Sequence, residues 1–300
     1  AVVEWTTDWR EDAARRDFTI NAMSMSAAGE VWDYFHGRDD LTAGRVRFVG
    51  DPATRLAEDY LRALRFFRFQ ARYGRGAPDP AAVAAIRDAV PHLGRLSAER
   101  VWMELKRLLA APDPTGAVAL MAETGVLGAV LPEGFDLRRL ETLIAAGAPA
   151  DPLLRFAALL ARGARDRQVA TRLRLSRDEA GRIGRARQTH GAPDCGASEA
   201  RLRAWASEAG PDALAQCWIA QIEVGGDCWD ARRQYIRTHE GDLKFPLQGR
   251  DVLELGVTPG EAVGSLLSDT VTWWRGGGCI ADRATCLSYL RELAVQNGLL

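Results

Sequence analysis

The chain of 300 residues has an ordinary globular composition, with 47% hydrophobic and 26% charged residues, and its length suits one large domain or two to three smaller ones. Its formal net charge of −1 excludes a uniformly basic nucleic-acid-binding protein, so any polyanion would have to meet a local basic patch. No apolar run approaches the ~18 residues of a membrane-spanning helix and no signal peptide opens the chain, which predicts a soluble protein.

The cysteines and histidines show little sign of a metal or disulfide site. The five cysteines are odd in number, lie in the second half of the chain and include no C-x-x-C pair. This pattern disfavours a disulfide framework and a zinc site, and a reducing cytoplasm fits it best. The four histidines are scattered through the sequence, so we predict that none of them binds a metal.

The first fifty residues are predicted to combine short strands with short helices. The expected elements, in chain order, are a strand over Ala1–Trp5, a short helix that starts near Thr6–Asp8 and leads to Ala14, a short helix over Phe18–Met23 capped by Asp17, a hairpin of Met23–Ser26 and Glu30–Asp33, one helical turn over Asp40–Ala43 ended by Gly44, and a strand over Arg45–Val49. Because the chain begins with Ala1 inside a strand-like segment, we interpret it as the remainder of a longer protein.

From Pro52 onward the apolar spacing is helical almost everywhere. Asp51 and Pro52 form a helix start, and Ser97 is predicted to cap a helix that ends at Ala110. A change in composition near Leu131–Gly134 predicts a domain boundary. Later helices are expected over Leu137–Ala146, Pro152–Arg162, Arg165–Leu173, Ser176–His190, Ser198–Glu208, Pro211–Glu223 and Asp227–Glu240, with terminal helices around Asp269–Trp274 and Ala281–Gln296. The expected fold class is α+β and predominantly α-helical.

Asp59 and Arg62 have the chemistry of a nucleobase reader. They lie three residues apart in a predicted helix and would be neighbours on one face. Cytosine and adenine present an amino donor beside a ring-nitrogen acceptor, whereas uracil and guanine present a carbonyl beside an N–H donor. A carboxylate, which only accepts, next to a guanidinium, which only donates, would complement the first pair and repel the second. The alternative is a surface ion pair worth about 0.2–0.5 kcal/mol.

Arg15, Arg16, Asp17 and Asn21 form a candidate group for binding the sugar and phosphates of a nucleotide. Arginines can hold phosphate oxygens through paired hydrogen bonds, and carboxylate or amide groups can bond a ribose hydroxyl. The alternative is that Asp17 only caps its helix while the two arginines are solvated surface.

The acidic segment from Asp33 to Leu41 is predicted to be a flexible loop. Asp33, Gly37 and Asp40 are its candidate functional residues, and Gly37 would allow a positive φ at a hinge. Alternatively, the acidic residues are only turn and cap residues. Asp39 and Asp40 are adjacent, but neighbouring side chains point in different directions, so they make a poor Mg²⁺ site. We find no complete metal centre in the sequence.

The most conspicuous charged segment is Arg155–Arg187, which contains ten arginines and only three acidic residues. A helical face of this sign could follow an RNA backbone by releasing counterions. The candidate RNA-binding residues are Arg165, Arg172, Arg174, Arg182 and Arg185. The alternative is a solvated helical surface, since only two of the 39 basic residues of this chain are lysines and arginine is therefore common throughout it.

Together these motifs resemble the bacterial-type (class II) tRNA nucleotidyltransferase and poly(A) polymerase family. RRDFTINAM, which starts at Arg15, matches the family's motif for the nucleotide sugar and phosphates, and EDYLR, which starts at Glu58, matches its E-D-x-x-R base-recognition motif. The acidic segment is similar to the family's flexible loop. Leu96–Leu109 resembles the helical motif that follows in the neck, and Gly249–Leu267 is similar to a tail segment of bacterial members.

The resemblance implies a nucleotidyltransferase head followed by a helical neck, body and tail. Residues 1–50 would be the end of the head, residues 51–131 the neck with the base-recognition helix, and residues 132–300 the body and tail that bind tRNA. The head of the family also carries a Gly-rich stretch and a D-x-D pair that holds the catalytic metals, whereas only fourteen residues precede Arg15. We therefore expect the catalytic carboxylates to lie outside this chain.

The implied activity is the addition of C, C and A to tRNA 3′ ends from CTP and ATP, with Mg²⁺ in the complete enzyme. Poly(A) addition is the alternative within the same family. A further alternative is a non-catalytic fragment that binds RNA and nucleotides. This chain alone is expected to select the nucleotide and bind tRNA without catalysing the transfer.

Overall fold

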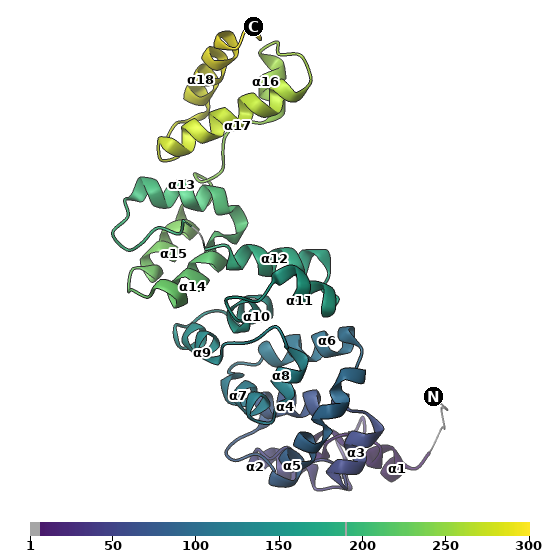
Figure 1. Ribbon diagram of the computed structural model, residues 1–300. Coiled ribbons are helices and arrows are strands. Elements are labelled where there is room, and N and C mark those ends of the chain that lie inside the picture. Colours follow the sequence, from purple (N-terminus) through teal and green to yellow (C-terminus); the bar gives the residue numbers. More distant parts are fainter. Residues whose placement is uncertain (1–6, 190) are drawn as a thin grey trace. The chain divides into compact units, whose positions relative to one another are not determined.

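The computed structural model describes residues 7–189 and 191–300 and shows a predominantly helical chain (Figure 1). The chain divides into two compact units, residues 1–184 and 185–300, and the boundary predicted near residue 131 falls inside the first. The sheet in the described residues has two strands, so the predicted α-helical fold with a small β element is confirmed. The strand predicted over residues 1–5 lies outside the described residues.

The first unit opens with a short helix and a hairpin. Helix α1 (Trp9–Ala14) is capped by Asp8, whose carboxylate accepts the Arg10 N–H at 2.8 Å. Strands β1 (Met23–Met25) and β2 (Val31–Asp33) pair in antiparallel fashion, which confirms the predicted hairpin.

Two predicted elements beside the hairpin are wrong in part. The helix expected after α1 is a single 3-10 turn, η1 (Thr19–Asn21). The strand expected over residues 45–49 is only an isolated bridge between Phe18 and Phe48. Side-chain packing reinforces this bridge, because the ring of Phe18 lies 4.9 Å from the ring of Phe48 and 4.9 Å from that of Phe69. All three phenylalanines are buried, and they pack the segments that carry Phe18 and Phe48 against the helix that carries Phe69.

Helices make up the rest of the first unit. They are α2 (Gly37–Ala43), α3 (Pro52–Glu58), α4 (Leu61–Tyr73), α5 (Pro80–Ala89), the 3-10 segment η2 (Val90–Arg95), α6 (Ala98–Leu109), α7 (Thr115–Glu123), α8 (Val126–Val130), α9 (Leu137–Ala145), α10 (Pro152–Leu159), α11 (Asp166–Arg172) and α12 (Arg177–Arg187), which ends in the second unit. The predicted caps are confirmed: Asp51 accepts the Thr54 N–H at 2.8 Å and Ser97 accepts the Arg100 N–H at 3.4 Å.

Helix α6 (Ala98–Leu109) and the turn after it support the middle of the first unit through one buried ion pair and one buried arginine that donates to backbone carbonyl oxygens. Arg68 of α4 donates to Glu104 at 2.6 Å, and Glu104 is only 4% exposed. Arg155 of α10 donates to the carbonyl oxygens of Leu109 at 2.7 Å and Pro112 at 3.1 Å, where α6 ends and its carbonyl groups lack N–H partners. Arg155 is therefore buried, and counting it in the basic surface segment was wrong.

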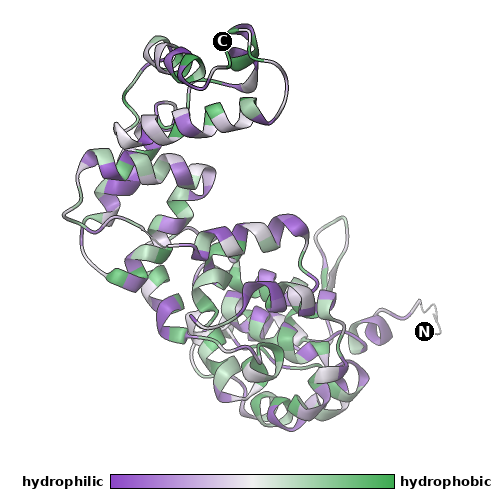
Figure 2. Ribbon diagram, turned by 45° about the horizontal axis from the view of Figure 1, so that its top comes forward, coloured by the Kyte–Doolittle hydropathy of each residue, from purple (hydrophilic) through white to green (hydrophobic). Residues whose placement is uncertain are grey.

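The second unit has two hydrophobic cores. Its helices are α13 (Glu199–Ala209), the 3-10 turn η3 (Gly210–Asp212), α14 (Ala213–Val224), α15 (Trp229–Thr238), α16 (Gly249–Glu254), α17 (Glu261–Gly276) and α18 (Arg283–Gln296). One core contains Trp205 and Trp229, and the other contains Leu266, Trp274 and Leu290. Figure 2 shows hydrophobic and hydrophilic residues on the same helices, as expected where one helical face packs on a core.

The cysteines differ from their prediction. Cys195 and Cys228, which are 33 positions apart in the sequence, form a disulfide, so the expectation of unpaired cysteines was wrong for these two. The folding back of α13 and α14 brings them together, which spacing along the chain could not indicate. Cys217, Cys279 and Cys286 are free and buried. Across the described residues, no helix combines the length and apolar character needed to cross a membrane.

Candidate nucleotide-binding site

The two predicted phosphate-binding arginines meet on one carboxylate. Arg15 Nη2 lies 2.6 Å from Asp12 Oδ1, and Arg16 Nη2 lies 2.8 Å from Asp12 Oδ2. The arginine side chains remain 58% and 50% exposed. The hydrogen bonds donated by Arg16 and then by Arg15 hold the pKa of Asp12 below its ordinary value. The structure therefore brings these arginines together at an accessible position.

Asp17 and Asn21 lie beside them but are used mainly within the protein. Asp17 is 5% exposed; it accepts a hydrogen bond from Asn21 Nδ2 at 2.6 Å and pairs with Arg65. Burial by itself raises the pKa of Asp17, but the hydrogen bonds from Arg65 and Asn21 outweigh it and leave that pKa lowered. The prediction that Asp17 caps the next helix was wrong, because Asn21 Oδ1 instead accepts the Phe18 N–H at 3.1 Å.

Asp59 does not share a helix with Arg62, so the prediction of one common helical face was wrong. Asp59 has an extended backbone, with φ of −155°, between α3 and α4. Its Oδ1 accepts the Leu61 N–H at 3.0 Å, and its Oδ2 accepts a hydrogen bond from Arg100 Nη2 at 2.5 Å. The carboxylate is thus held at a junction between helices by one local and one distant donor.

Arg62 is fixed by groups from two segments of the chain. It pairs with Glu58 one turn earlier and donates to the Arg55 carbonyl oxygen at 2.8 Å. Its Nη2 also donates to the Arg15 carbonyl oxygen at 3.2 Å. Only 15% of the Arg62 side chain is exposed. The predicted base reader is therefore tied directly to the segment that carries the predicted phosphate-binding arginines.

The acidic segment is helical where a loop was predicted. Gly37 is the first residue of α2, and the positive φ of 61° belongs to His36, so the proposed hinge at Gly37 was wrong. Gly37 instead allows close packing, because an added Cβ would lie 2.2 Å from the carbonyl oxygen of Thr19. Asp33 accepts the N–H groups of Gly37 at 2.8 Å and Arg38 at 2.9 Å. This geometry agrees with the alternative that Asp33 is a cap residue.

Asp40 is a buried anchor within the same segment. Its side chain has no exposed surface, and it accepts hydrogen bonds from Thr19 Oγ1 at 2.7 Å, Arg47 Nε at 2.8 Å and Arg45 Nε at 3.1 Å. Asp40 therefore joins α2 to η1 and to the segment of the Phe48 bridge. A buried carboxylate with these three partners is a structural support.

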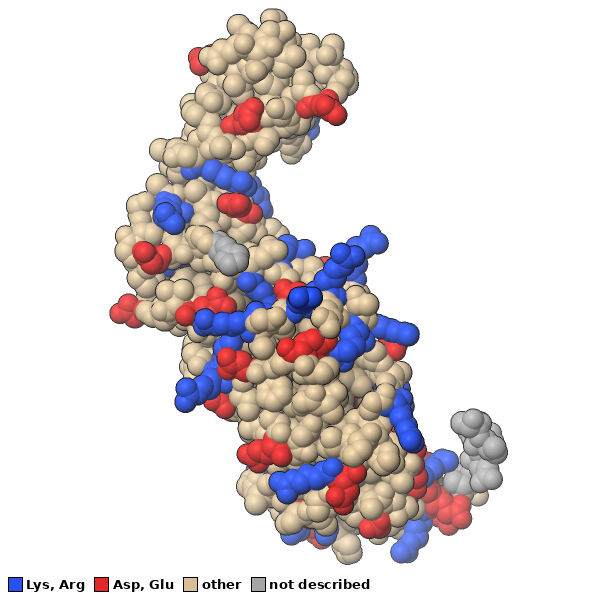
Figure 3. All heavy atoms as spheres, in the orientation of Figure 1, with Lys and Arg blue, Asp and Glu red and all other residues tan. Residues whose placement is uncertain are grey.

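Four of the five predicted RNA-binding arginines pair with carboxylates. The pairs are Arg172 with Glu133 at 2.6 Å, Arg174 with Glu99 at 2.5 Å, Arg182 with Asp151 at 2.7 Å and Arg185 with Asp212 at 2.5 Å. The fifth, Arg165, borders a hollow of about 250 Å³ that Arg172 also lines. Figure 3 shows basic side chains projecting beside acidic ones. All four carboxylates lie outside residues 155–187, so the charge counted along that segment overstates the charge of its surface.

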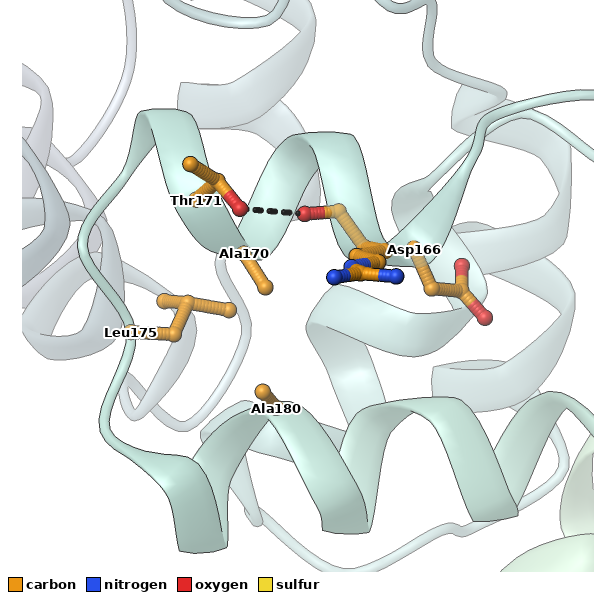
Figure 4. A pocket seen from close by; sticks show the side chains of 6 residues that line it. Asp166, Ala170, Thr171, Leu175 and Ala180 are labelled. Carbon is orange, nitrogen blue, oxygen red and sulfur yellow. Dashed lines mark hydrogen bonds between the residues drawn. The ribbon is translucent and has the colours of Figure 1, made fainter.

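A second hollow, of about 350 Å³, lies between α11 and α12 (Figure 4). Ala170, Leu175 and Ala180 contribute small or apolar side chains to it. Thr171 Oγ1 also lines it but already donates to the Arg167 carbonyl oxygen at 2.9 Å. We therefore do not place the nucleotide in this hollow.

Residues that were not among the predicted site residues complete the candidate site. Asp12 and Glu58 hold arginines three or four positions away, and this spacing is a signal that could have revealed them. Arg65 pairs with a partner 48 positions away and Arg100 with a partner 41 positions away. No local pattern indicates such distant contacts.

The described residues do not fit a Mg²⁺ site. Within residues 7–189 and 191–300, no group of three or more His, Cys, Asp or Glu side chains could hold a metal ion. The adjacent pair considered from the sequence diverges, because Asp40 is buried whereas 76% of the Asp39 side chain is exposed. We therefore derive no step through a metal from these residues.

Comparison with known proteins identifies the family. Residues 1–47 match the poly A polymerase head domain, and residues 77–137 match the probable RNA and SrmB-binding site of polymerase A. The mitochondrial CCA tRNA nucleotidyltransferase 1 of Mus musculus is 30% identical, over 97% of this chain and 69% of the relative. That of Danio rerio is 31% identical, over 92% of this chain and 65% of the relative. The chain belongs to the tRNA nucleotidyltransferase and poly(A) polymerase family and spans about two thirds of the length of these relatives.

Solved structures agree with this assignment. The Bacillus stearothermophilus CCA-adding enzyme in complex with CTP matches with a TM-score of 0.70 and 25% identity, over 98% of this chain and 76% of the other. The Thermotoga maritima CCA-adding enzyme complexed with tRNA matches with a TM-score of 0.65 and 20% identity, over 96% and 74%; this second likeness shows the fold alone. Because two relatives are named as mitochondrial enzymes, the cytoplasmic location stays a prediction from the sequence.

Proposed function

We propose that this chain is the nucleotide-selecting and RNA-binding part of an enzyme that adds C, C and A to tRNA 3′ ends from CTP and ATP. The observation that carries the proposal is the bond between Arg62 Nη2 and the Arg15 carbonyl oxygen at 3.2 Å, which ties the base-reading segment to the phosphate-binding one. The relatives named above as CCA-adding or CCA tRNA nucleotidyltransferase enzymes support the same activity.

Asp59 and Arg62 would read the base edge. Asp59 uses one lone pair of each carboxylate oxygen on Leu61 and Arg100, and each oxygen has a second lone pair that can accept an amino group. Arg62 would donate to the ring nitrogen beside that amino group. This arrangement favours cytosine and adenine because uracil and guanine would place a carbonyl oxygen against the carboxylate.

The neighbouring residues would hold the rest of the nucleotide. Arg15 and Arg16 are exposed cations suited to the phosphates. Asn21 is partly exposed and keeps the proposed role toward the ribose. Asp17 is buried and paired with Arg65, so we assign to it the positioning of this group. Among the described residues we assign no ligands to the Mg²⁺ that the family implies.

RNA binding is proposed for the arginine-rich surface formed by α11, α12 and the residues directly before and between them. Arg165, Arg174 and Arg182 belong to the first unit, and the side chains of the latter two are 70% and 45% exposed in spite of their ion pairs. A surface ion pair is weak, so a phosphate can compete for the guanidinium group.

Equilibrium binding tests the proposal directly. The chain is titrated with CTP, ATP, UTP and GTP, and it should bind the first two more tightly; equal binding of all four would contradict the proposal. Incubation with CTP, ATP, Mg²⁺ and a tRNA that ends at the discriminator base then tests transfer. Products that contain only added A would favour the poly(A) alternative, and nucleotide binding without transfer is the result expected if the catalytic carboxylates lie outside this chain.

A further inference from the structure

Asp12 has a place in the candidate site that the sequence did not suggest. Both of its oxygens accept hydrogen bonds from guanidinium groups: Arg15 donates from Nε at 2.9 Å and from Nη2 at 2.6 Å, and Arg16 donates from Nε at 3.3 Å and from Nη2 at 2.8 Å. Only 23% of the Asp12 side chain is exposed. One carboxylate thus orients two neighbouring cations.

We propose that Asp12 is a positioning residue that holds Arg15 and Arg16 ready for the triphosphate of the incoming nucleotide. The inference rests on the proposed function, because it assumes that these arginines bind phosphate. It goes further by naming the residue that sets their geometry in the absence of nucleotide.

Asp12 engages only part of each guanidinium group. A guanidinium group has five N–H donors, and Asp12 takes one from Nε and one from Nη2 of each arginine. The other donors of each group do not point at Asp12, and phosphate oxygens can compete for them. A side chain that is already oriented loses less conformational freedom when the ligand binds, so Asp12 lowers the entropic cost of capturing the triphosphate.

Arg15 connects the candidate phosphate-binding cations with the candidate base reader. Arg15 bonds through its side chain to Asp12 and through its carbonyl oxygen to Arg62. The distance between the phosphate-binding cations and the base reader is therefore set by one residue. A nucleotide must contact both the arginines and the base reader. The site therefore selects molecules that carry a base and a phosphate chain together.

Replacing Asp12 distinguishes two possible roles of its carboxylate, because they predict opposite changes in the affinity for CTP. If Asp12 only competed with the ligand as an anion, Asp12→Asn would free two cations and tighten the binding of CTP. If Asp12 positions the arginines, Asp12→Asn should weaken the binding of CTP about five- to tenfold, although the protein becomes more positive. Cytidine has no phosphates, so its affinity should change little in either case.

The experiment is a calorimetric titration of the whole chain with CTP and with cytidine. Glu30→Gln is the matched control, because Glu30 is an exposed acid in the hairpin turn and its replacement removes the same charge. Asp12→Glu keeps the carboxylate and should retain most of the affinity, while Asp12→Ser should repeat the loss. Thermal unfolding of each variant checks that the fold is intact.

Every outcome bears on the inference. Unchanged or tighter CTP binding by Asp12→Asn and Asp12→Ser overturns the positioning role while leaving the proposed function in place. An equal loss for cytidine and CTP also overturns it, because the effect would then not involve the phosphates. If the unmodified chain binds no CTP, the proposed function fails and the inference fails with it.

Discussion

Two regions of this chain are rich in arginine, and the arginine side chains form different patterns of hydrogen bonds in each. In the candidate nucleotide site the hydrogen bonds converge: Asp12 takes two guanidinium groups, and Arg62 bonds to a carboxylate and to two carbonyl oxygens. In the arginine-rich segment, exposed arginines instead form separate pairs with single carboxylates, as between Arg182 and Asp151 or between Arg174 and Glu99. Convergent bonds fix donors at set distances, which suits a small ligand, whereas separate exposed pairs suit a long and variable polyanion.

The number of arginines in a segment therefore does not by itself define a phosphate-binding site. The segment that ends at Arg187 contains ten arginines, yet several are neutralised by acids from other parts of the chain. The candidate nucleotide site has fewer cations, and they lie beside the buried carboxylates Asp17 and Asp40, which pair with other arginines and connect the segments of the site. If this arrangement matters more than the charge, removing a buried carboxylate should have a larger effect than reversing an exposed arginine.

The largest expected effect is the loss of the buried anchor. Asp40→Asn would leave Arg45 and Arg47 without their shared anion and should reduce the free energy of unfolding by about 2–3 kcal/mol. Asp39→Asn is the matched control, because this neighbouring side chain is 76% exposed. Urea denaturation measures both, and an equal loss in the two variants would show that burial of Asp40 carries no special weight.

The next effect concerns base selection. Asp59→Ala removes the acceptor proposed to bond the amino group, so the preference for CTP over UTP should fall by about tenfold or more in equilibrium titrations. Asp88→Ala, at an exposed position on α5, should leave the preference unchanged. An unchanged preference for CTP over UTP in Asp59→Ala would refute the proposed role of this carboxylate in reading the base.

A smaller effect is expected from Glu179, at the start of α12. Burial raises its pKa, but the bonds from Lys106 and from the Ser176 N–H outweigh burial and lower that pKa to about 2. The folded state thus favours the ionised form, so its contribution to stability is present above the ordinary value near 4.5 and is lost as the pH falls toward 2.

Glu179→Gln should therefore be less stable than the unmodified chain at pH 6, and the two should converge near pH 2. Chemical denaturation across this range measures the difference. Asp178→Asn, an exposed neighbour, should follow the unmodified chain at each pH. A constant gap between Glu179→Gln and the unmodified chain would contradict the assigned cause.

The smallest effect is expected on tRNA binding when exposed arginines are replaced. Reversing Arg165 and Arg182 to Glu should weaken tRNA binding a few-fold and flatten its dependence on salt, by about one in the logarithmic slope for each phosphate that the protein no longer neutralises. Arg87→Glu, at an exposed position on α5, is the control for net charge. An unaltered salt dependence would show that these arginines do not contact the tRNA phosphates.

Local sequence signals determined much of the secondary structure and the family. The caps at Asp51 and Ser97, the hairpin of β1 and β2 and the helical spacing after Pro52 all depend on residues within a few positions of one another. Such features follow from local hydrogen bonds and periodic packing, so they can be predicted without the fold. The arginine and acidic motifs likewise lie in short segments and indicated the family.

Which distant side chains meet depends on the tertiary structure. Asp17 pairs with Arg65, Asp59 with Arg100 and Cys195 with Cys228, and each pair joins residues more than thirty positions apart. The same is true of Arg172 and Glu133, whose pairing lowers the expected charge of the surface proposed to bind RNA. These pairings depend on how whole helices pack, and that packing is set by buried apolar surface from the entire unit, which no short stretch of sequence contains.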